Sequence, residues 1–245
     1  VCIRGFETDG HKYVKNALEN GACAIAAEEP VYADVPVICY ENTRIALADL
    51  ACRYFGNPSE KFTLIGVTGT NGKTTTTYLL KSIMETAGKC VGVIGTNQNI
   101  IGDKMLETQT NIPTTPNSLE LQQMFEEMAR CGADCVIMEV SSHALELGRV
   151  HGCEFDVGAF TNLTQDHLDF HKTMENYMKA KAKLFDISRC GAINIDDEYG
   201  KRILDMHSDK DILTYGIENP ADVMAENIDI TARGTEFDLI YKRVR

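Results

Sequence analysis

The sequence lacks several features that would identify whole classes of protein. Its 245 residues contain no N-terminal signal pattern. No apolar run approaches the roughly 18 residues of a membrane-spanning helix. The nine cysteines, odd in number, include no Cys-x-x-Cys pair, which argues against a metal or disulfide framework and favours reduced, buried thiols. We therefore expect a cytoplasmic protein with no membrane partner.

An excess of positive charge is also missing. The chain has 24 Lys and Arg against 36 Asp and Glu, a net charge of −12 and a pI near 4.9. This balance argues against a general nucleic-acid-binding surface, so we expect no nucleic-acid partner. An acidic chain of this kind must bring cations together locally wherever it binds phosphate.

The interpretation rests on residues 62–77, FTLIGVTGTNGKTTTT. The first half is an apolar run typical of a strand buried on both faces. Gly69 and Gly72 then permit a tight turn, and Lys73 and Thr74 begin a helix. The free N–H groups of such a loop and the positive end of the helix dipole bind phosphate. The lysine adds a positive charge, and the threonine hydroxyl can ligate Mg²⁺.

The match to the general phosphate-loop pattern is imperfect, because Val67 stands where that pattern has its first glycine. The string GTNGKTTT is nevertheless far rarer than a lone Gly-x-Gly. A Gly-rich strand-to-helix turn without a ligand is the alternative, but turn chemistry does not require the Lys-Thr pair. We therefore predict a phosphate-binding loop.

The order of predicted elements divides the chain into two units, residues 1–60 and 61–245. The first unit is a small α/β domain, and Asn42 caps its last helix. Its other predicted elements are a strand at 1–6, a helix around 13–20, and strands near 22–27 and 35–40. The Gly-Asn-Pro-Ser segment at 56–59 marks the boundary. The second unit alternates strand and helix, which predicts an α/β fold with a doubly wound, mostly parallel sheet.

Two stretches of the second unit depart from this alternation. Residues 97–113 read as a polar loop, after which Thr115 caps a helix with Pro116 at its first position. After residue 221, extended segments near 224–231 and 235–242 predict a small antiparallel sheet.

Three polar segments follow the carboxyl ends of predicted strands. They are the phosphate loop, residues 139–143 (EVSSH) and residues 161–167 (TNLTQDH). Ligands of open parallel sheets bind beyond the carboxyl ends of the strands. We therefore expect the three segments to converge at one edge of the sheet.

Two residues at this edge are candidate metal ligands. Glu139 ends an apolar strand, where a charge is costly unless it is paired or metal-bound. A Mg²⁺ ligand beside a triphosphate fits, and a buried ion pair is the alternative. His167 lies close to Asp166, Asp169 and His171. That spacing suits a transition metal, but Mg²⁺ or Mn²⁺ agrees better with ATP, and a hydrogen-bonded loop histidine is the alternative.

Lys181 lies within the apolar stripe of a helix predicted over 173–187. The stripe has helical spacing and consists of Met174, Tyr177, Met178, Leu184 and Phe185. A lysine in such a stripe usually extends its amine to solvent. The alternative is that burial depresses its pKa and leaves a free amine that can react.

Other polar groups near the same edge carry a weaker signal. Capping, turn or surface roles explain Thr114, Thr115, Ser141 and Arg149 equally well. Asn194, at the end of the predicted strand AINI, could contact a nucleotide base.

These motifs coincide in one family. GTNGKTTT, TTPNSLELQ, MEVSSHALELGRV, FTNLTQDHLDFH and the helix ending AKAKLF resemble the Mur ligases of peptidoglycan synthesis. Among these they are most similar to the ligases that add the third residue. The resemblance spans nearly the whole chain, and residues 1–60 are similar to the family's UDP-binding N-terminal domain. Folylpolyglutamate synthetases, with the same fold and chemistry, and a non-catalytic ATP-binding module are the alternatives, but EVSSH and DHLDFH favour the Mur ligases.

The resemblance implies a monomeric enzyme of cell-wall synthesis, and hence of cell shape and division. ATP would phosphorylate the terminal carboxylate of UDP-MurNAc-L-Ala-D-Glu, and the amine of meso-diaminopimelate or L-lysine would displace the phosphate. The sequence does not choose between the two amino acids. The resemblance also implies that the chain lacks the family's extreme N-terminus and its C-terminal domain, so we expect the chain alone to be inactive.

The resemblance assigns roles to individual residues. ATP would be held by Gly69, Thr70, Asn71, Gly72, Lys73, Thr74 and Thr75, with Asn194 at the base. Metal would be held by Thr74, Glu139, His167 and a carbamate formed from CO₂ on Lys181. Thr114, Thr115, Ser141 and Arg149 would contact the UDP-sugar peptide, and Lys73, His167 and Lys181 would serve catalysis.

Overall fold

Twelve strands are described in the computed structural model, which covers residues 1–106 and 113–241. They are β1 Ile25–Ala27, β2 Val37–Cys39, β3 Thr63–Thr68, β4 Val91–Ile94, β5 Asn99–Ile101, β6 Lys104–Met105, β7 Cys135–Glu139, β8 Phe155–Phe160, β9 Ser188–Asn194, β10 Asp211–Gly216, β11 Val223–Thr231 and β12 Gly234–Tyr241. Ten of them form one sheet in the order β12-β11-β10-β9-β8-β3-β7-β4-β5-β6.

Helices connect most of these strands. The α-helices are α1 Val14–Glu19, α2 Thr43–Tyr54, α3 Lys73–Thr86, α4 Ser118–Arg130, α5 Ser142–Glu146, α6 Leu168–His171, α7 Met174–Asp186 and α8 Glu198–Met206. Two 3₁₀-helices are η1 Gly10–Tyr13 and η2 Pro58–Lys61. No helix in the described part of the chain is both long enough and apolar enough to cross a membrane.

The centre of the large sheet is parallel and is covered on both faces. Strands β10, β9, β8, β3, β7 and β4 pair in parallel. Alternate residues of β3 enter two different cores, as the two-residue period of a strand requires. Leu64 packs in the core that contains residues of α4 and α7, whereas Ile65 and Val67 pack in the core that α3 covers. The predicted doubly wound α/β sheet is confirmed.

Both edges of this sheet are antiparallel. β11 and β12 form the predicted antiparallel pair, and β11 also continues the large sheet by pairing in parallel with β10. At the other edge, β5 and β6 lie within residues 97–113, where we expected only a polar loop. That expectation is wrong for these strands, and residues 107–112 lie outside the described part.

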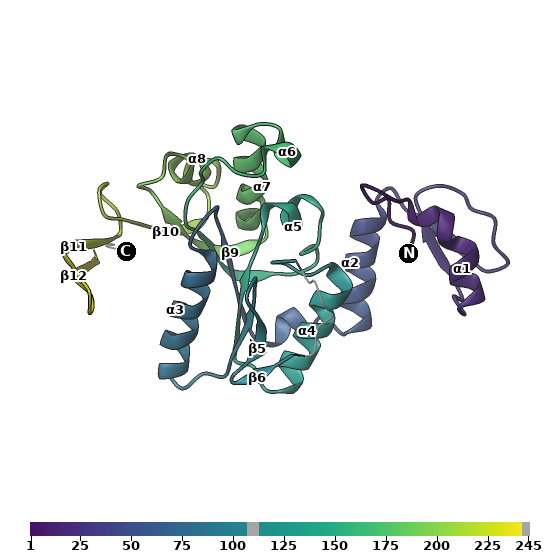
Figure 1. Cartoon of the computed structure of the whole chain (residues 1–245), viewed down its shortest axis with the longest axis horizontal. Helices are drawn as coiled ribbons and strands as arrows, with labels where there is room; N and C mark the ends of the chain where they lie inside the picture. Colours follow the sequence, from purple (N-terminus) through teal and green to yellow (C-terminus); the bar gives the residue numbers. More distant parts are fainter. Residues whose placement is uncertain (107–112, 242–245) are drawn as a thin grey trace.

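The N-terminal part has a small core of its own. β1 and β2 pair in parallel, and Cys2, Val14, Ile25 and Ala27 are buried together. In Figure 1 this part lies to one side, with α2 next to it, and β11 and β12 lie at the opposite end. The prediction of a strand at residues 1–6 is wrong. The only β-type pairing of these described residues is an isolated bridge from Arg4 to Asp9.

Two local expectations concern helix starts. Asn42 caps α2 as predicted, because its side chain accepts hydrogen bonds from the N–H groups of Arg44 and Ile45. Thr115 does not cap a helix. Asn117 is the cap of α4 and accepts from the N–H of Glu120, so Pro116 lies outside the helix.

The expectation that the cysteines are buried holds only in part. Cys23, Cys39 and Cys131 are exposed.

Candidate functional site

The phosphate loop connects β3 to α3 through two glycines with positive φ. Gly69 has φ 150° and Gly72, the residue before α3, has φ 84°. A Cβ on Gly69 would lie only 1.9 Å from the Thr161 hydroxyl oxygen. Glycine is therefore required there both for its conformation and for the close approach of the neighbouring loop.

The segment 161–164 holds this loop from the side. Asn162 accepts hydrogen bonds from Thr70 N–H through its backbone oxygen (2.8 Å) and from Asn71 N–H through its side chain (3.0 Å). The Thr161 hydroxyl donates to the Asn71 carbonyl at 2.7 Å, and Thr164 N–H donates to the Thr70 hydroxyl at 3.0 Å. Two of the three segments expected at this edge therefore meet directly.

Lys73 folds back over the loop that precedes it. Its amine donates to the carbonyl oxygens of Gly69 and Thr70, both at 2.9 Å. Burial lowers the Lys73 pKa, and the negative charges of Glu139 and Asp166 raise it to a smaller extent. Thr75, also predicted to bind ATP, is exposed in the first turn of α3.

Glu139, in the segment 139–143, brings the third segment to the same place. Its side chain is buried at the end of β7, with the residue only 1% exposed. One carboxylate oxygen accepts from the Thr74 hydroxyl (2.9 Å) and from Thr96 N–H (3.0 Å). The other accepts from the Thr96 hydroxyl at 3.2 Å. A Cβ on Gly95 would lie 2.3 Å from this carboxylate, so a glycine must stand beside it.

These residues fit a divalent cation. Within the described ranges, no Lys or Arg forms an ion pair with the buried Glu139 carboxylate. A hydroxyl and a carboxylate oxygen beside a phosphate loop are ligands that Mg²⁺ accepts, with phosphate and water oxygens completing its shell. The described residues contain no group of three or more His, Cys, Asp or Glu side chains that could hold a metal ion.

A second group of polar residues lies next to Glu139. The buried Thr115 hydroxyl donates to the Glu139 carbonyl (2.9 Å) and accepts from Ser141 N–H (3.0 Å). Arg149 donates to the Thr115 carbonyl at 2.9 Å, and burial lowers its pKa. The Thr114 hydroxyl lies within hydrogen-bond distance of the Thr96 hydroxyl, at 3.0 Å. The four residues predicted to contact the substrate thus lie close together, with Thr115 itself buried beneath the surface.

Lys181 is buried and does not extend to solvent. The residue is 1% exposed, and its amine donates to the Gly69 carbonyl at 2.7 Å. The amine also lies 4.7 Å from the centre of the Tyr177 ring. Burial, with a further contribution from the positive charge of Lys73, holds the pKa of Lys181 well below its ordinary value. The apolar stripe thus places a basic amine against the phosphate loop.

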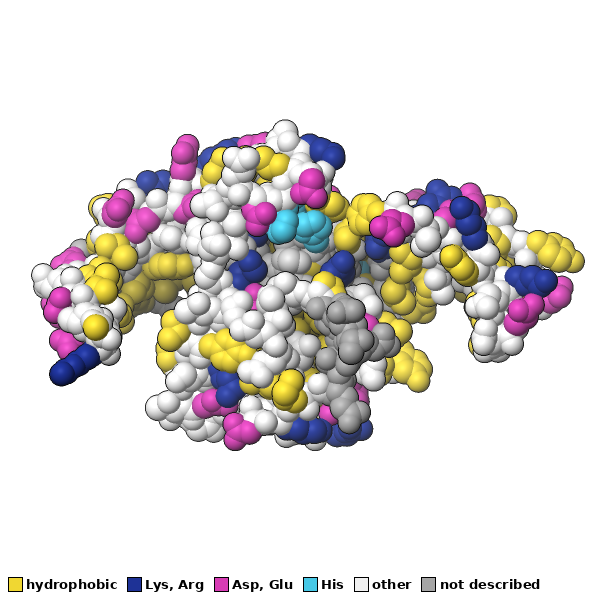
Figure 2. Space-filling view, in the orientation of Figure 1, with side chains coloured by type: hydrophobic (Ala, Val, Ile, Leu, Met, Phe, Trp, Pro, Cys, Tyr) yellow, Lys and Arg dark blue, Asp and Glu magenta, His cyan; other side chains and the backbone are white. Residues whose placement is uncertain are grey.

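His167 and Asn194 lie at the margin of this group. His167 is half exposed, has a positive φ of 50°, and contacts Asp166 at 3.4 Å. Its ring centre lies 4.9 Å from that of His143 and 6.2 Å from that of Tyr177. Asn194 donates to the Thr161 carbonyl at 2.9 Å, which places it beside the phosphate loop. In Figure 2 histidine side chains gather near the middle of the face, with basic side chains close by.

The prediction missed Thr96, Thr161 and Tyr177. Thr96 follows β4 and therefore lies at the same edge as the other segments, a positional signal that could have identified it. Thr161 stood within a segment that we singled out, but only the structure shows it packed against Gly69. Tyr177 was assigned to the core, and its hydroxyl contacts the Thr70 hydroxyl at 3.3 Å.

Two family models match the chain. The Mur ligase middle domain matches residues 67–245, and the model described as the Mur ligase family catalytic domain matches residues 1–55. A UDP-N-acetylmuramoyl-L-alanyl-D-glutamate–2,6-diaminopimelate ligase of Clostridium acetobutylicum is 51% identical over an aligned stretch of 248 residues, which covers 100% of this chain and 50% of the relative. The enzyme of that name from Bacillus licheniformis is 48% identical over an aligned stretch of 252 residues, which covers 98% of this chain and 50% of the relative. The chain thus spans about half the length of the curated relatives it matches.

Solved structures give a similar result. A UDP-N-acetylmuramoyl-L-alanyl-D-glutamate–2,6-diaminopimelate ligase superposes with a TM-score of 0.85 at 30% identity, covering 95% of this chain and 48% of that one. A Mycobacterium tuberculosis folylpolyglutamate synthase complexed with ADP and AMPPCP superposes with a TM-score of 0.65 at 14% identity. The superposition covers 80% of this chain and 51% of that one. The second likeness shows a shared fold only.

Proposed function

The chain belongs to the Mur ligase family, and from this premise we propose that the whole protein is an ATP-dependent amide ligase of peptidoglycan synthesis. It would join a diamino acid to UDP-MurNAc-L-Ala-D-Glu. The names of the relatives favour 2,6-diaminopimelate over L-lysine as that amino acid. The meso form is our prediction.

The observation that carries this proposal is the contact between Thr74 of the phosphate loop and the buried Glu139. It joins a nucleotide site to the surface that holds Thr115, Ser141 and Arg149, because Thr115 bonds the carbonyl of that same glutamate. A ligase of this kind must bring two anions together, the substrate carboxylate and the ATP phosphates. That requires cations and precise placement more than covalent chemistry by the protein.

The residues of the phosphate loop would bind and orient ATP. The N–H groups of Thr70 and Asn71 already donate to Asn162. The other N–H groups of the loop and the start of α3 would face the phosphates, and Lys73 would exchange its two carbonyl acceptors for phosphate oxygens. Asn194 would contact the base. A divalent cation held through Thr74 and Glu139 would neutralise phosphate charge when bound. The substrate carboxylate would attack the terminal phosphate and release ADP, which gives an acyl phosphate. The amine of the diamino acid would then attack the acyl carbon, form the amide and release inorganic phosphate and a proton.

Lys181 would act after modification. Its depressed pKa favours a neutral amine, whose lone pair can attack CO₂. A nitrogen–carbon bond forms, the electrons of one carbon–oxygen bond move to oxygen, and the nitrogen loses a proton. The resulting carbamate would present two oxygens for a second metal, with His167 as its other protein ligand. Mn²⁺ would serve in place of Mg²⁺.

The surface next to Glu139 would hold the rest of the nucleotide-sugar peptide. Thr114, Thr115, Ser141 and Arg149 supply hydroxyl groups and one guanidinium for its peptide and sugar. The N-terminal unit, which we place at residues 1–60, would bind the UDP end, and residues 61–245 would form the central unit. We further propose a cytoplasmic monomer whose loss affects cell shape and division.

The test is phosphate release by the full-length protein. With ATP, Mg²⁺ and UDP-MurNAc-L-Ala-D-Glu, we expect release that depends on meso-diaminopimelate and is weak with L-lysine. A panel that includes folate substrates tests the folylpolyglutamate alternative.

The Lys73→Ala variant should lose detectable ATP binding or turnover while remaining folded, because phosphate charge is left uncompensated in an acidic protein. Near-normal activity of that variant would remove the phosphate-loop assignment, and ATP binding without turnover would favour a module that only binds nucleotide.

A further inference from the structure

A tight turn projects one aromatic ring out of the N-terminal unit. Arg4 and Asp9 form an antiparallel bridge, and between them Gly5 N–H donates to the Thr8 carbonyl at 2.8 Å. A Cβ on Gly5 would lie 2.8 Å from that same carbonyl oxygen, so the turn requires a glycine. The ring at its tip is Phe6, which is 77% exposed. We refer to residues 4–9 as the Phe6 turn.

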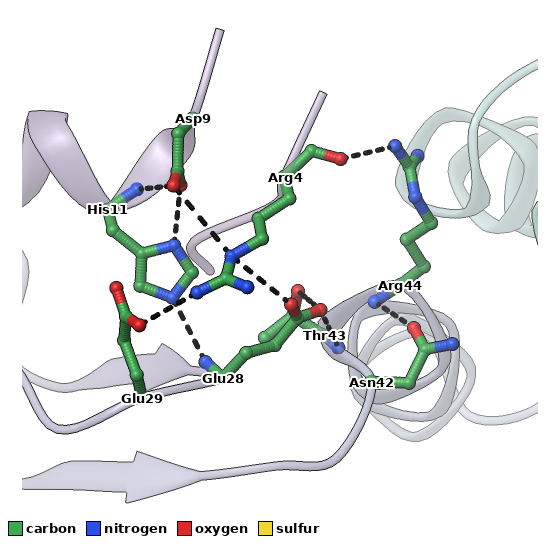
Figure 3. Close-up of polar contacts among 8 residues, drawn as sticks. All are labelled: Arg4, Asp9, His11, Glu28, Glu29, Asn42, Thr43 and Arg44. Atoms are coloured by element: carbon green, nitrogen blue, oxygen red, sulfur yellow. Dashed lines mark hydrogen bonds and ion pairs between the residues drawn. The ribbon is translucent and has the colours of Figure 1, made fainter. Parts of the chain in front are cut away.

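A network of charges fixes the base of the Phe6 turn (Figure 3). The Arg4 guanidinium lies 3.8 Å from Asp9, 3.6 Å from Glu28 and 2.8 Å from Glu29. The Asp9 carboxylate lies 2.6 Å from His11 Nδ1, and His11 Nε2 accepts from Glu28 N–H at 3.0 Å. That acceptance leaves the ring proton on Nδ1, where it donates to Asp9. The turn is therefore held by its neighbours and not only by its own backbone.

The same network attaches residues 1–41, the part of the N-terminal unit that precedes α2, to α2 itself. Glu28 accepts hydrogen bonds from the N–H (3.0 Å) and the hydroxyl (2.9 Å) of Thr43, the first residue of α2. Arg44 donates to the Arg4 carbonyl at 2.7 Å. Elsewhere α2, the last helix of residues 1–60, packs against α4 and so joins the N-terminal unit to the central part of the molecule. This is one attachment between the two parts.

A second attachment lies at the tip of the Phe6 turn. The Phe6 ring meets the Phe170 ring edge-on, with centres 5.9 Å apart and planes at 79°. Phe170 belongs to α6 and lies 4.2 Å from His143 and 4.8 Å from His171. His171 in turn stacks on Tyr177 at 4.8 Å and 24°. The N-terminal unit thus touches a series of packed rings that ends at Tyr177, whose hydroxyl contacts Thr70 of the phosphate loop.

We infer that Phe6 and Phe170 are positioning residues that hold the N-terminal unit in place over the rim of the candidate site. A unit attached only through α2 can rotate about that attachment, whereas a second contact at Phe170 fixes its orientation. This role rests on the proposed function, in which the N-terminal unit binds the UDP end of a substrate whose peptide must reach Glu139 and the phosphate loop. A misplaced unit would present the peptide out of reach of ATP.

The first test uses this chain without substrate and measures hydrogen exchange. Phe6→Ala should speed exchange of the amides at 167–173 by at least about threefold, and Phe170→Leu should do the same at 5–10. The double variant should add little to either single change, since both remove one contact. Tyr13→Ala, which removes an exposed ring from the same unit, is the matched control and should leave residues 167–173 unchanged. If neither segment responds to the loss of the opposite ring, the inference is wrong.

The second test uses the full-length enzyme. Either substitution should raise KM for the UDP-sugar peptide by about threefold to tenfold, with KM for ATP and kcat within about twofold. The effects of the two substitutions should not add. Equal increases in both KM values, or additive effects, would indicate a general structural role and overturn the inference. If the wild type releases no phosphate with this substrate, the proposed function fails, and the exchange measurement still decides whether the contact exists.

Discussion

At the scale of single residues, Lys181 combines two properties that rarely occur together. It is almost fully buried, and its amine faces a carbonyl and an aromatic ring instead of a carboxylate. Its position among apolar residues could be predicted from the sequence by helical periodicity, which left open whether the amine is buried or extends to solvent. Its contact with Gly69 could not, because 112 residues separate the two in the chain.

Replacing Lys181 tests its proposed modification. In the full-length enzyme, Lys181→Ala should lose most activity, because the carbamate oxygens that position metal disappear. Short-chain carboxylic acids in the buffer should restore part of it by placing two oxygens in the vacated space. Lys183→Ala is the matched control, since Lys183 lies on the same helix but its side chain is half-exposed and pairs with Glu146. Normal activity of Lys181→Ala with no response to added acid would contradict the carbamate.

Thr96 is the residue whose importance was least evident from the sequence. A single threonine after a strand carries no motif, and its role depends on Glu139 and Thr114, which are distant in the chain. Its hydroxyl bonds both, and its N–H holds the other oxygen of the glutamate. Thr96 therefore orients the carboxylate proposed to bind Mg²⁺.

We expect Thr96→Val to weaken Mg²⁺ binding more than it lowers the stability of the fold. The substitution removes a hydroxyl that donates to a charged group, an interaction worth about 1.5–3 kcal/mol. The Mg²⁺ concentration for half-maximal phosphate release should rise about tenfold, and Thr96→Ser should remain close to the wild type. Titration of both full-length variants with Mg²⁺ at saturating ATP measures this. An unchanged Mg²⁺ requirement in Thr96→Val would show that Glu139 binds Mg²⁺ without the hydrogen bond from the Thr96 hydroxyl.

At the scale of elements, the chain carries clear local signals at some helix starts and misleading ones at others. Asn42 precedes α2 and caps it, as its residue type predicts. Thr115 has the same preference, but tertiary structure uses its hydroxyl to bond Glu139 and Ser141 instead. Residues 1–6 carry strand-forming side chains, yet the turn at Gly5 leaves only one bridge. Local preference fails where a long-range contact competes for the same group.

The cap of α2 can be measured directly. Asn42→Ala should lower the free energy of unfolding by about 0.5–1 kcal/mol, the low end of the range for such caps. The loss is limited because Glu28 also accepts hydrogen bonds from the first residue of the helix. Asn42→Ser keeps an oxygen acceptor and should unfold within about 0.3 kcal/mol of the wild type. Urea unfolding of the three proteins makes the comparison, and equal losses in both variants would refute a capping role.

At the scale of the whole molecule, the alternation of strands and helices predicted the class of fold but not the order of its strands. Strands β3, β7 and β8 are neighbours in the sheet although other elements separate them in sequence. Pairing between distant strands depends on how helices cover both faces, which periodicity does not encode. The predicted convergence of three segments needed only the rule for carboxyl ends of parallel strands. The additional contacts at Phe6 and Phe170 needed the structure.

The stability of the folded molecule should depend on pH through His171. Burial, with a smaller contribution from the charge of His143, lowers its pKa from 6.5 to about 4. The unfolded chain therefore takes up a proton at this residue near pH 6.5, whereas the folded protein does so only near pH 4. Unfolded molecules bind more protons in this window, so stability is complete above it and falls as pH decreases through it.

A comparison with His171→Gln isolates this contribution from the carboxylates that also titrate in acid. Glutamine can still bond the Ser142 hydroxyl, which lies 2.8 Å from His171 Nε2, but it takes up no proton. Between about pH 7 and about pH 4.5, the wild type should lose roughly 2 kcal/mol more unfolding free energy than the variant. Urea unfolding at half-unit pH steps measures the difference. Equal losses of unfolding free energy in the two proteins would mean that His171 is solvated enough to be protonated in the folded state. The stacked rings of His171 and Tyr177 would then tolerate a positive charge.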